Sequence, residues 1–236
     1  IHAVETAAVH EFAVRPRIVP QQNWYHLYLS SEEQLARGKR NPIVKWFDEE
    51  LGIYGQHSRQ KLIPEIIFGQ NRGKLALFLK HLWSTDGCVH VNKRLKGPLV
   101  RIYYASGSEQ LVKQVQHLLL RLGIISRVGH TGKLGYEDIW GVHVQGKTDQ
   151  LRFLKLVGGI GDKAEIVKQA IEKLVGIEAN PNNDVIPKDV WEDIEILRQE
   201  AGLTTRQFHA RLGWAYSGTQ RHKHGLSRDR LRRVMQ

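Results

Sequence analysis

The chain has 236 residues, 41% of them hydrophobic and 25% charged, which is a globular composition with enough apolar residues for one large or two modest cores. Its 35 Lys and Arg outnumber 24 Asp and Glu, so the formal net charge is +11. This excludes an acidic disordered chain and favours a polyanionic partner, nucleic acid first, because neutralised phosphates release condensed counterions. Simple solubility of a basic surface is the alternative.

The cysteine content and the hydropathy pattern indicate the cellular compartment in which the protein is expected. The single cysteine, Cys88, excludes an internal disulfide, which fits a reducing compartment. No apolar run approaches the roughly 20 residues of a membrane span. We therefore expect a cytoplasmic protein with no membrane partner. Because the chain starts at Ile1 and its first residues resemble the middle of a helix, we also expect it to be a part of something longer.

The N-terminal segment predicts a helix, two short strands and a second helix. Residues 1–11 have apolar residues at helical spacing, and residues 15–19 and 24–29 have the pattern of strands. Asn41-Pro42 is a typical helix start, and Gly52 a typical stop. Pro64 is then placed to begin a short helical turn.

The central region alternates single helices with pairs of strands. Its first helix has Leu75, Leu79 and Leu82 in one apolar stripe, and Ser106 or Ser108 is expected to cap the second. The expected elements are a helix over 74–86, strands over 88–92 and 100–104, a helix over 109–122, strands near 125–128 and 140–145, and helices over 149–157 and to about 175. This α-β-β-α-β-β-α order predicts an α+β fold in which helices cover one face of an antiparallel sheet, and the other face is free to meet a ligand.

The C-terminal region predicts a second, all-α domain. Asn180-Pro181-Asn182-Asn183 is typical of a linker, and four short helices are expected beyond it, over 190–201, 204–212, about 215–223 and 228–235. From Leu203 to the end there are eight Lys or Arg and one acid, Asp229, a net charge of +7. More than half of the excess charge therefore lies here.

Several blocks of sequence, in order, resemble the LAGLIDADG homing endonucleases found inside inteins. Phe78-Leu79-Lys80-His81-Leu82-Trp83-Ser84-Thr85-Asp86-Gly87 matches the second dodecapeptide motif, Lys61-Leu62-Ile63-Pro64 matches a Lys-x-Ile-Pro block, and Ser108 with residues 115–124 matches the helix after the first hairpin. Residues 22–26 and 41–47 resemble inteins hosted in bacterial replicative DNA helicases. The resemblance implies the homing-endonuclease fold, with its sheet as a saddle on double-stranded DNA, and metal-dependent hydrolysis of both strands.

The end of the motif helix is the candidate catalytic centre. Phosphodiester cleavage needs an in-line water, a divalent cation and charge stabilisation. A carboxylate at this position, Asp86, can bind a hard cation, Mg²⁺ or Mn²⁺, which would also resolve its conflict with the helix dipole. An Asp-Gly turn that ends an ordinary helix is the alternative. The resemblance places Lys61 and Lys163 beside the scissile phosphate, where either would orient water or stabilise charge; for each lysine, simple solvation is the alternative.

The free face of the sheet is the candidate DNA-binding surface. Alternate residues of a two-sided strand split between core and groove, and Arg, Asn and Gln read base edges while Lys positions phosphates. A solvated polar face is the alternative for any single residue. The candidates are His90, Asn92, Lys93, Arg94, Arg101, Tyr103, Arg127, His130, Lys133, His143 and Gln145.

The C-terminal region gives a second DNA-binding signal. Residues 196–213 resemble the first two helices of a repressor-type helix-turn-helix, with residues 215–223 as the recognition helix. A basic helical bundle is the alternative. The DNA-binding candidates here are Arg206, Arg221, Lys223 and Arg228.

Two departures from the family pattern affect the functional hypothesis. His81 stands where the motif usually has Gly, and Lys80 where it has Ala, so the seam between motif helices is expected to be wider or differently built. An intact enzyme has two motifs, each giving one acid to a shared metal site, and residue 1 is expected to fall after the first. Splicing residues are expected at neither Ile1 nor the C-terminus. Dimerisation would bring two Asp86 residues together, but His81 at the seam disfavours it.

These observations divide the chain into residues 1–60, the remainder of a first LAGLIDADG half; 61–179, the second half; 180–189, a linker; and 190–236, a helix-turn-helix domain. The leading hypothesis is a site-specific double-strand DNA endonuclease of intein homing, here incomplete, whose partners are DNA and a host intein splicing domain. The alternative is a non-catalytic, sequence-specific DNA-binding protein derived from such an enzyme.

Overall fold

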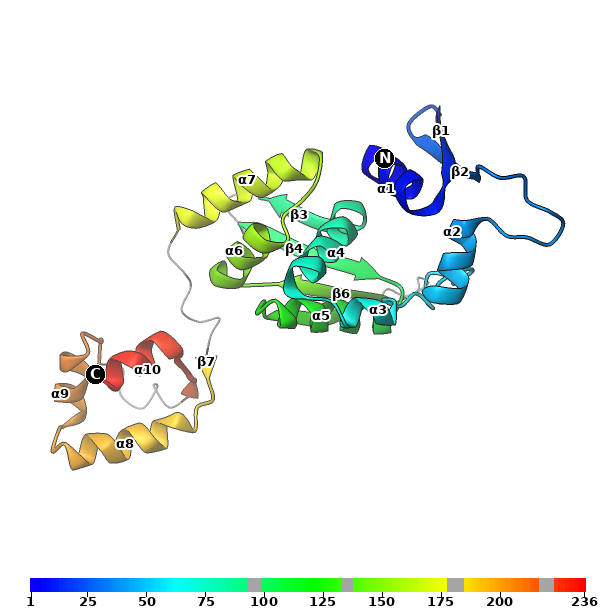
Figure 1. Cartoon of the computed structure of the whole chain (residues 1–236). Helices are drawn as coiled ribbons and strands as arrows, with labels where there is room; N and C mark the ends of the chain where they lie inside the picture. The colour runs from blue at the N-terminus through cyan, green and yellow to red at the C-terminus, as the bar shows by residue number, and fades with distance from the viewer. Residues whose placement is uncertain (93–98, 133–137, 178–184, 217–222) are drawn as a thin grey trace.

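The computed structural model describes residues 1–92, 99–132, 138–177, 185–216 and 223–236 (Figure 1). Its N-terminal part is a helix, an antiparallel hairpin and a second helix, as the sequence predicts: α1 (His2–Phe12), β1 (Val14–Pro20), β2 (Tyr25–Ser31), and α2 (Pro42–Lys45), which continues as the π-helix η1 (Trp46–Glu50). The Asn41 side chain accepts a hydrogen bond from the Ile43 amide at 2.9 Å, which caps α2.

The central part has the predicted alternation of helices and strand pairs. Its elements are α3 (Glu65–Phe68), α4 (Arg72–Thr85), β3 (Gly87–Val91), β4 (Val100–Ser106), α5 (Glu109–Arg121), β5 (Ser126–Thr131), β6 (Ile139–Val144), α6 (Lys147–Leu156) and α7 (Asp162–Val175). The strands form one antiparallel sheet in the order β3-β4-β6-β5. The predicted α+β fold is therefore confirmed for this region.

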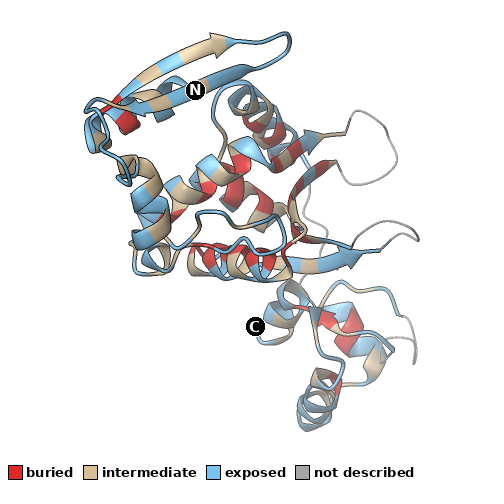
Figure 2. Cartoon of the chain, turned by 90° about the vertical axis from the view of Figure 1, so that its right-hand side faces the viewer, coloured by how far each residue is buried: buried red, intermediate tan, exposed pale blue. Residues whose placement is uncertain are grey.

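One face of this sheet is covered by helices, and the core lies between them (Figure 2). Val89, Ile102 and Val144 lie in one row across the sheet and are buried. They join one cluster with buried residues of α4, α5, α6 and α7, among them Leu79 and Phe153. The alternate residues of the same strands lie on the opposite face.

The apolar stripe of α4 differs from the predicted one in its last member. Leu75, Leu79 and Trp83 are buried, whereas Leu82 is half-buried at the edge of the core. Trp83 fills the space because its ring contacts Phe153 of α6 and Tyr104 of β4, with centroids 4.8 and 5.6 Å apart. Trp83 is buried in place of Leu82 because α6 and the sheet lie on the side of α4 that Trp83 faces, one residue further around the helix.

Side-chain hydrogen bonds hold the ends of the central helices. Ser108, and not Ser106, caps α5: its Oγ accepts from the Leu111 amide at 3.1 Å. At the carbonyl end of α5, Arg72 donates to the carbonyls of Arg121 and Leu122 at 2.8 and 3.0 Å. The Arg121 guanidinium in turn donates to the carbonyls of Phe68, the last residue of α3, and of Gln70. Cations near the last carbonyls also stabilise the helix dipole.

The C-terminal part has a small core of its own. It contains α8 (Val190–Glu200), α9 (Thr205–Arg211), α10 (Arg228–Val234) and the short pair β7 (Val185–Ile186) and β8 (Leu226–Ser227). Trp191, Ile194, Phe208 and Leu226 form its buried cluster. Residues 185–186, predicted within the linker, are thus paired with β8.

Three of the four C-terminal helices are present as predicted. Of the proposed recognition helix, residues 217–222 lie outside the described residues, and Ala215, Tyr216 and Lys223 are not α-helical. The predicted linker residues 180–184 also lie outside them. Within the described ranges, no helix has the length and apolar character that a membrane crossing requires.

Candidate nucleic-acid interface

The helix-free face of the sheet gathers most of the predicted DNA-binding residues. The register aligns Cys88, Tyr103, His143 and Arg127 in one row, and His90 opposite Arg101 in the next. Asn92, whose amide donates to the Leu99 carbonyl at 2.8 Å, and Gln145, which follows β6, continue the same alternation. Seven predicted residues therefore share this face: His90, Asn92, Arg101, Tyr103, Arg127, His143 and Gln145. We call it the open face.

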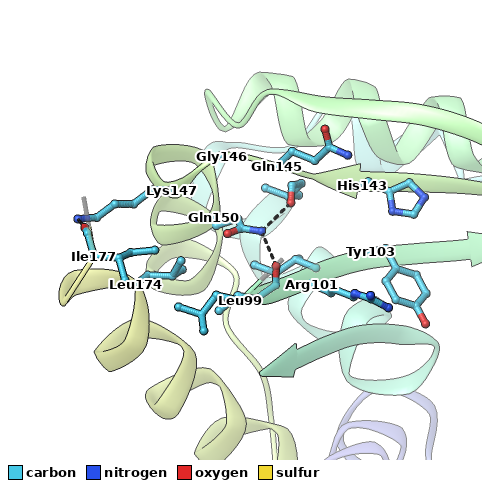
Figure 3. Close-up of a pocket in the computed structure, with 13 residues that line it drawn as sticks. Leu99, Arg101, Tyr103, His143, Gln145, Gly146, Lys147, Gln150, Leu174 and Ile177 are labelled. Atoms are coloured by element: carbon cyan, nitrogen blue, oxygen red, sulfur yellow. Dashed lines mark hydrogen bonds between the residues drawn. The ribbon is translucent and has the colours of Figure 1, made fainter. Parts of the chain in front are cut away.

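A hollow lies at one end of the sheet, between the ends of β4 and β6 and residues of α6 and α7 (Figure 3). The Gln150 side-chain amide from α6 donates to the carbonyls of Val100 and Val144 at 3.0 and 3.1 Å, and so links the ends of β4 and β6. The resulting hollow has a volume of about 710 Å³, and Arg101 and Gln145 are among its lining residues. The surface is therefore concave and basic at this end.

Neutral hydrogen-bonding groups lie between the two arginines of the open face. The rings of Tyr103 and His143 are 5.6 Å apart. Burial lowers the pKa of His143, so its imidazole is neutral near pH 7 and offers one donor and one acceptor. A hydrogen bond with the Cys88 thiol is the main cause that raises the pKa of Tyr103, so its hydroxyl stays protonated. Together with Arg101 and Arg127, these two side chains have the chemistry of base-edge and phosphate contact.

Some predicted members are not on the open face. His130 was wrongly assigned: it pairs with Trp140 in the register and lies on the other face, where its ring is 5.2 Å from the indole. The cause is the phase of β5, in which Arg127 and His130 have opposite parity. Lys93, Arg94 and Lys133 lie outside the described residues. Cys88 was not among the predicted residues, although it lies two positions before His90 in β3, on the same face, and contacts Tyr103.

Asp86 lies at the other end of the sheet, between the last turn of α4 and the first residue of β3. It is exposed, and its amide donates to the Leu82 carbonyl at 3.1 Å. The next residue must be glycine, because a Cβ on Gly87 would lie 2.3 Å from Cδ1 of Trp83. Burial, and secondly the charge of Asp86, raise the pKa of Tyr104 to about 12. The Asp86 carboxylate is therefore close enough to the hydroxyl of Tyr104 to affect it.

The two candidate lysines lie at the same end of the sheet as Asp86, but in different ways. Lys163, in the first turn of α7, donates from its ammonium group to the carbonyls of Trp83, Thr85 and Gly87 at 2.9, 3.3 and 2.7 Å. Lys61 is exposed, and its carbonyl accepts from Ser108 Oγ at 2.8 Å. Because Ser108 follows the end of β4, which pairs with the start of β3, the Lys61 backbone is fixed near this end.

The oxygen ligands at this end fit a hard cation in part. Among the described residues, no three His, Cys, Asp or Glu side chains are grouped to hold a metal. Asp86 supplies one exposed carboxylate, and Mg²⁺ is often bound through one or two carboxylates together with water and substrate phosphates. Asp86 therefore fits as one ligand of a shared site.

The predicted DNA-binding residues of the C-terminal part are exposed where they are described. The Arg206 guanidinium lies over the Tyr216 ring, 5.4 Å from its centroid. Lys223 and Arg228 are exposed, and Arg228 begins α10. Arg221 lies outside the described residues.

Comparison with known proteins identifies the central part of the chain. Residues 73–158, from α4 to the end of α6, match the family model described as a LAGLIDADG-like domain. This part of the chain is thus similar to a LAGLIDADG-like domain.

Longer relatives match almost the whole chain. The chain is 39% identical over 230 residues to the replicative DNA helicase DnaB of Rhodothermus marinus, and 40% identical over 225 residues to that of Nostoc sp.. Each match covers 94% of this chain but only 24% and 25% of the relative, so the chain spans about a quarter of the length of these proteins. A crystal structure of I-DmoI in complex with DNA and Mn is similar at a TM-score of 0.45 and 17% identity, over 67% of this chain and 72% of that one.

Proposed function

We propose that the chain is the DNA-recognising part of a site-specific, metal-dependent DNA endonuclease of the homing type, inserted in a replicative helicase as part of an intein. The observation that supports this most directly is the placement of Asp86 at the end of a sheet face that presents Arg101, Arg127, His143 and Gln145. The LAGLIDADG-like domain spans these residues, and the DnaB relatives match both it and its flanks.

The open face would bind the major groove of double-stranded DNA. The arginines can neutralise phosphates as well as contact base edges, the amide of Gln145 can form bidentate contacts with base edges, and a twisted antiparallel sheet can follow the groove. The exposed cations of the C-terminal part, Arg206, Lys223 and Arg228, would add contacts in a helix-turn-helix-like module outside the central site. Two separated surfaces would together recognise a long target.

Asp86 would hold one side of a Mg²⁺ or Mn²⁺ ion, which when bound supplies charge stabilisation and a nucleophilic water. The second carboxylate of such a site would come from another segment of the parent protein or from a second copy of the chain. Lys61, tethered through its carbonyl to Ser108, is exposed and able to approach a phosphate. The chain's own residues would thus bind the DNA and orient one half of the cleavage site.

The test is cleavage of a plasmid that contains the uninterrupted helicase-gene insertion site, in the presence of Mg²⁺. We compare the chain with its Asp86→Asn variant and with Asp193→Asn, which changes an exposed carboxylate on α8. Cutting by the chain and by Asp193→Asn, but not by Asp86→Asn, is the expected result. Cutting that survives in Asp86→Asn would refute the assigned role of Asp86.

A non-catalytic DNA-binding protein is the second candidate function. The observation behind it is that, within the described residues, no group of three His, Cys, Asp or Glu side chains could hold a metal. The second candidate predicts specific, salt-sensitive binding to the same plasmid with no cutting by any variant. Absence of specific binding would refute both functions.

A further inference from the structure

The ammonium group of Lys163 is fully occupied by the backbone on either side of Asp86. An ammonium has three donor hydrogens. In Lys163 they face three carbonyls: that of Trp83, three residues before Asp86, and those of its immediate neighbours Thr85 and Gly87. Each of these carbonyls is at the end of α4 or the start of β3. A group bound in this way has no donor left for a phosphate.

The loop before α7 is built to deliver this lysine. Gly158 and Gly161 have φ of +65° and +61°, which favour glycine. A Cβ on Gly159 would lie only 3.0 Å from Cβ of Lys163, so the loop approaches the lysine closely at this glycine. The Ile160 amide donates to Ser84 Oγ at 3.1 Å, and Ser84 Oγ donates to the Lys80 carbonyl at 2.7 Å. Loop and lysine together bind the last turn of α4.

We infer that Lys163 is a positioning residue for the carboxylate of Asp86, and that it does not contact the scissile phosphate. It fixes the backbone on both sides of Asp86, so the carboxylate emerges from the helix end in one direction. It also supplies a positive charge where the carbonyl end of α4 and the carboxylate would otherwise place negative groups together. This inference rests on the proposed role of Asp86 as a metal ligand, and it revises the role that sequence resemblance implies for Lys163.

The chain provides a matched control in Lys147. The Lys147 ammonium donates to the carbonyls of Val175, at 3.5 Å, and Ile177, after α7. It thus holds a helix end as Lys163 does, but at the hollowed end of the sheet, away from Asp86. If Mn²⁺ binding is weakened only because a helix end becomes less rigid, the weakening should appear in Lys147→Met as well as in Lys163→Met.

The experiment measures Mn²⁺ binding to the full chain by the loss of the free Mn²⁺ resonance, with urea unfolding as the check that each variant is folded. Lys163→Met should weaken Mn²⁺ binding roughly 10- to 100-fold, the usual cost of losing a group that orients a metal ligand. Lys147→Met should bind as the unmodified chain does. Unchanged binding in Lys163→Met, or an equal loss in Lys147→Met, would overturn the inference.

Two further measurements separate this inference from the proposed function. If Asp86→Asn binds Mn²⁺ as the unmodified chain does, the metal site itself is wrong. Amide hydrogen exchange then still tests whether Lys163 holds the backbone around Asp86. Lys163→Met should accelerate exchange of the amides of residues 84–88, and Lys147→Met should not. Unaltered exchange of these amides in Lys163→Met would overturn the inference that Lys163 holds this backbone, whatever the result of the Mn²⁺ measurement. Lys163→Arg, which keeps the charge but replaces the three-donor group by a planar one, should restore Mn²⁺ binding only in part.

Discussion

The two arginines of the open face give a quantitative test of DNA binding. Arg101 on β4 and Arg127 on β5 are both exposed on the open face, with β6 between them, and Arg101→Ala/Arg127→Ala removes both charges without touching the core. For contacts with duplex DNA, the slope of log K against log salt changes by about 0.9 per phosphate contact. Two contacts therefore amount to a slope smaller by about 1.8, and to an affinity lower by about 60-fold at about 0.1 M salt.

The assay is fluorescence anisotropy of a labelled duplex that contains the insertion site, titrated from about 50 to about 200 mM KCl. Lys113→Ala/Lys168→Ala is the control, because it lowers the net charge equally by changing exposed lysines on α5 and α7, whose buried residues pack against the covered face. The control should keep the slope of the unmodified chain. Equal slopes for the two double variants would show that DNA does not bind on the open face.

Two further predictions concern stability. Ser108→Ala removes the cap of α5 and the hydrogen bond to the Lys61 carbonyl, at a residue that is only 2% exposed. The free energy of unfolding in urea should therefore fall by about 2 kcal/mol. The control, Ser58→Ala at an exposed position, should change it by less than about 0.5 kcal/mol. An equal effect of the two changes would contradict this account of the cap. Burial lowers the pKa of His143 below 6.5, so the unfolded chain takes up the proton first as the pH falls, and stability is lost as the pH drops through that range. His143→Gln should lose less stability than the unmodified chain between about pH 7 and about pH 5, and parallel losses would show that His143 does not contribute.

Most of the central fold could be predicted from the sequence because local pattern and tertiary contact agree there. Alternation along residues 100–106 separates Ile102 and Tyr104, which are buried, from Arg101 and Tyr103, which are on the open face. The third buried residue of α4 was missed because Leu82 and Trp83 are both near the stripe, and only the placement of α6 selects Trp83. The face of His130 was predicted wrongly because the strand was expected only near residues 125–128, whereas β5 continues to Thr131 and places Arg127 and His130 on opposite faces.

The candidate site was predictable in its residues and less so in their contacts. The Asp-Gly pair at 86–87 is visible in the sequence, and so is the glycine-rich stretch before Lys163. The role of Lys163 depends on carbonyls about 80 positions earlier in the chain, and backbone carbonyls have no sequence signature. A lysine that binds them is indistinguishable in sequence from a lysine that binds a phosphate. The structure separates the two by the direction of the ammonium group.

The same use of cations at helix ends has a consequence for protein engineering. Lys163, Lys147, Arg72 and Arg121 each bind main-chain carbonyls at the end of a helix. They count toward the basic charge of the chain, yet their side chains stabilise helix ends by hydrogen bonds within the protein. A redesign that replaces basic residues to reduce non-specific adhesion to nucleic acids during purification should therefore spare these four and begin with exposed positions such as Lys113 and Lys168.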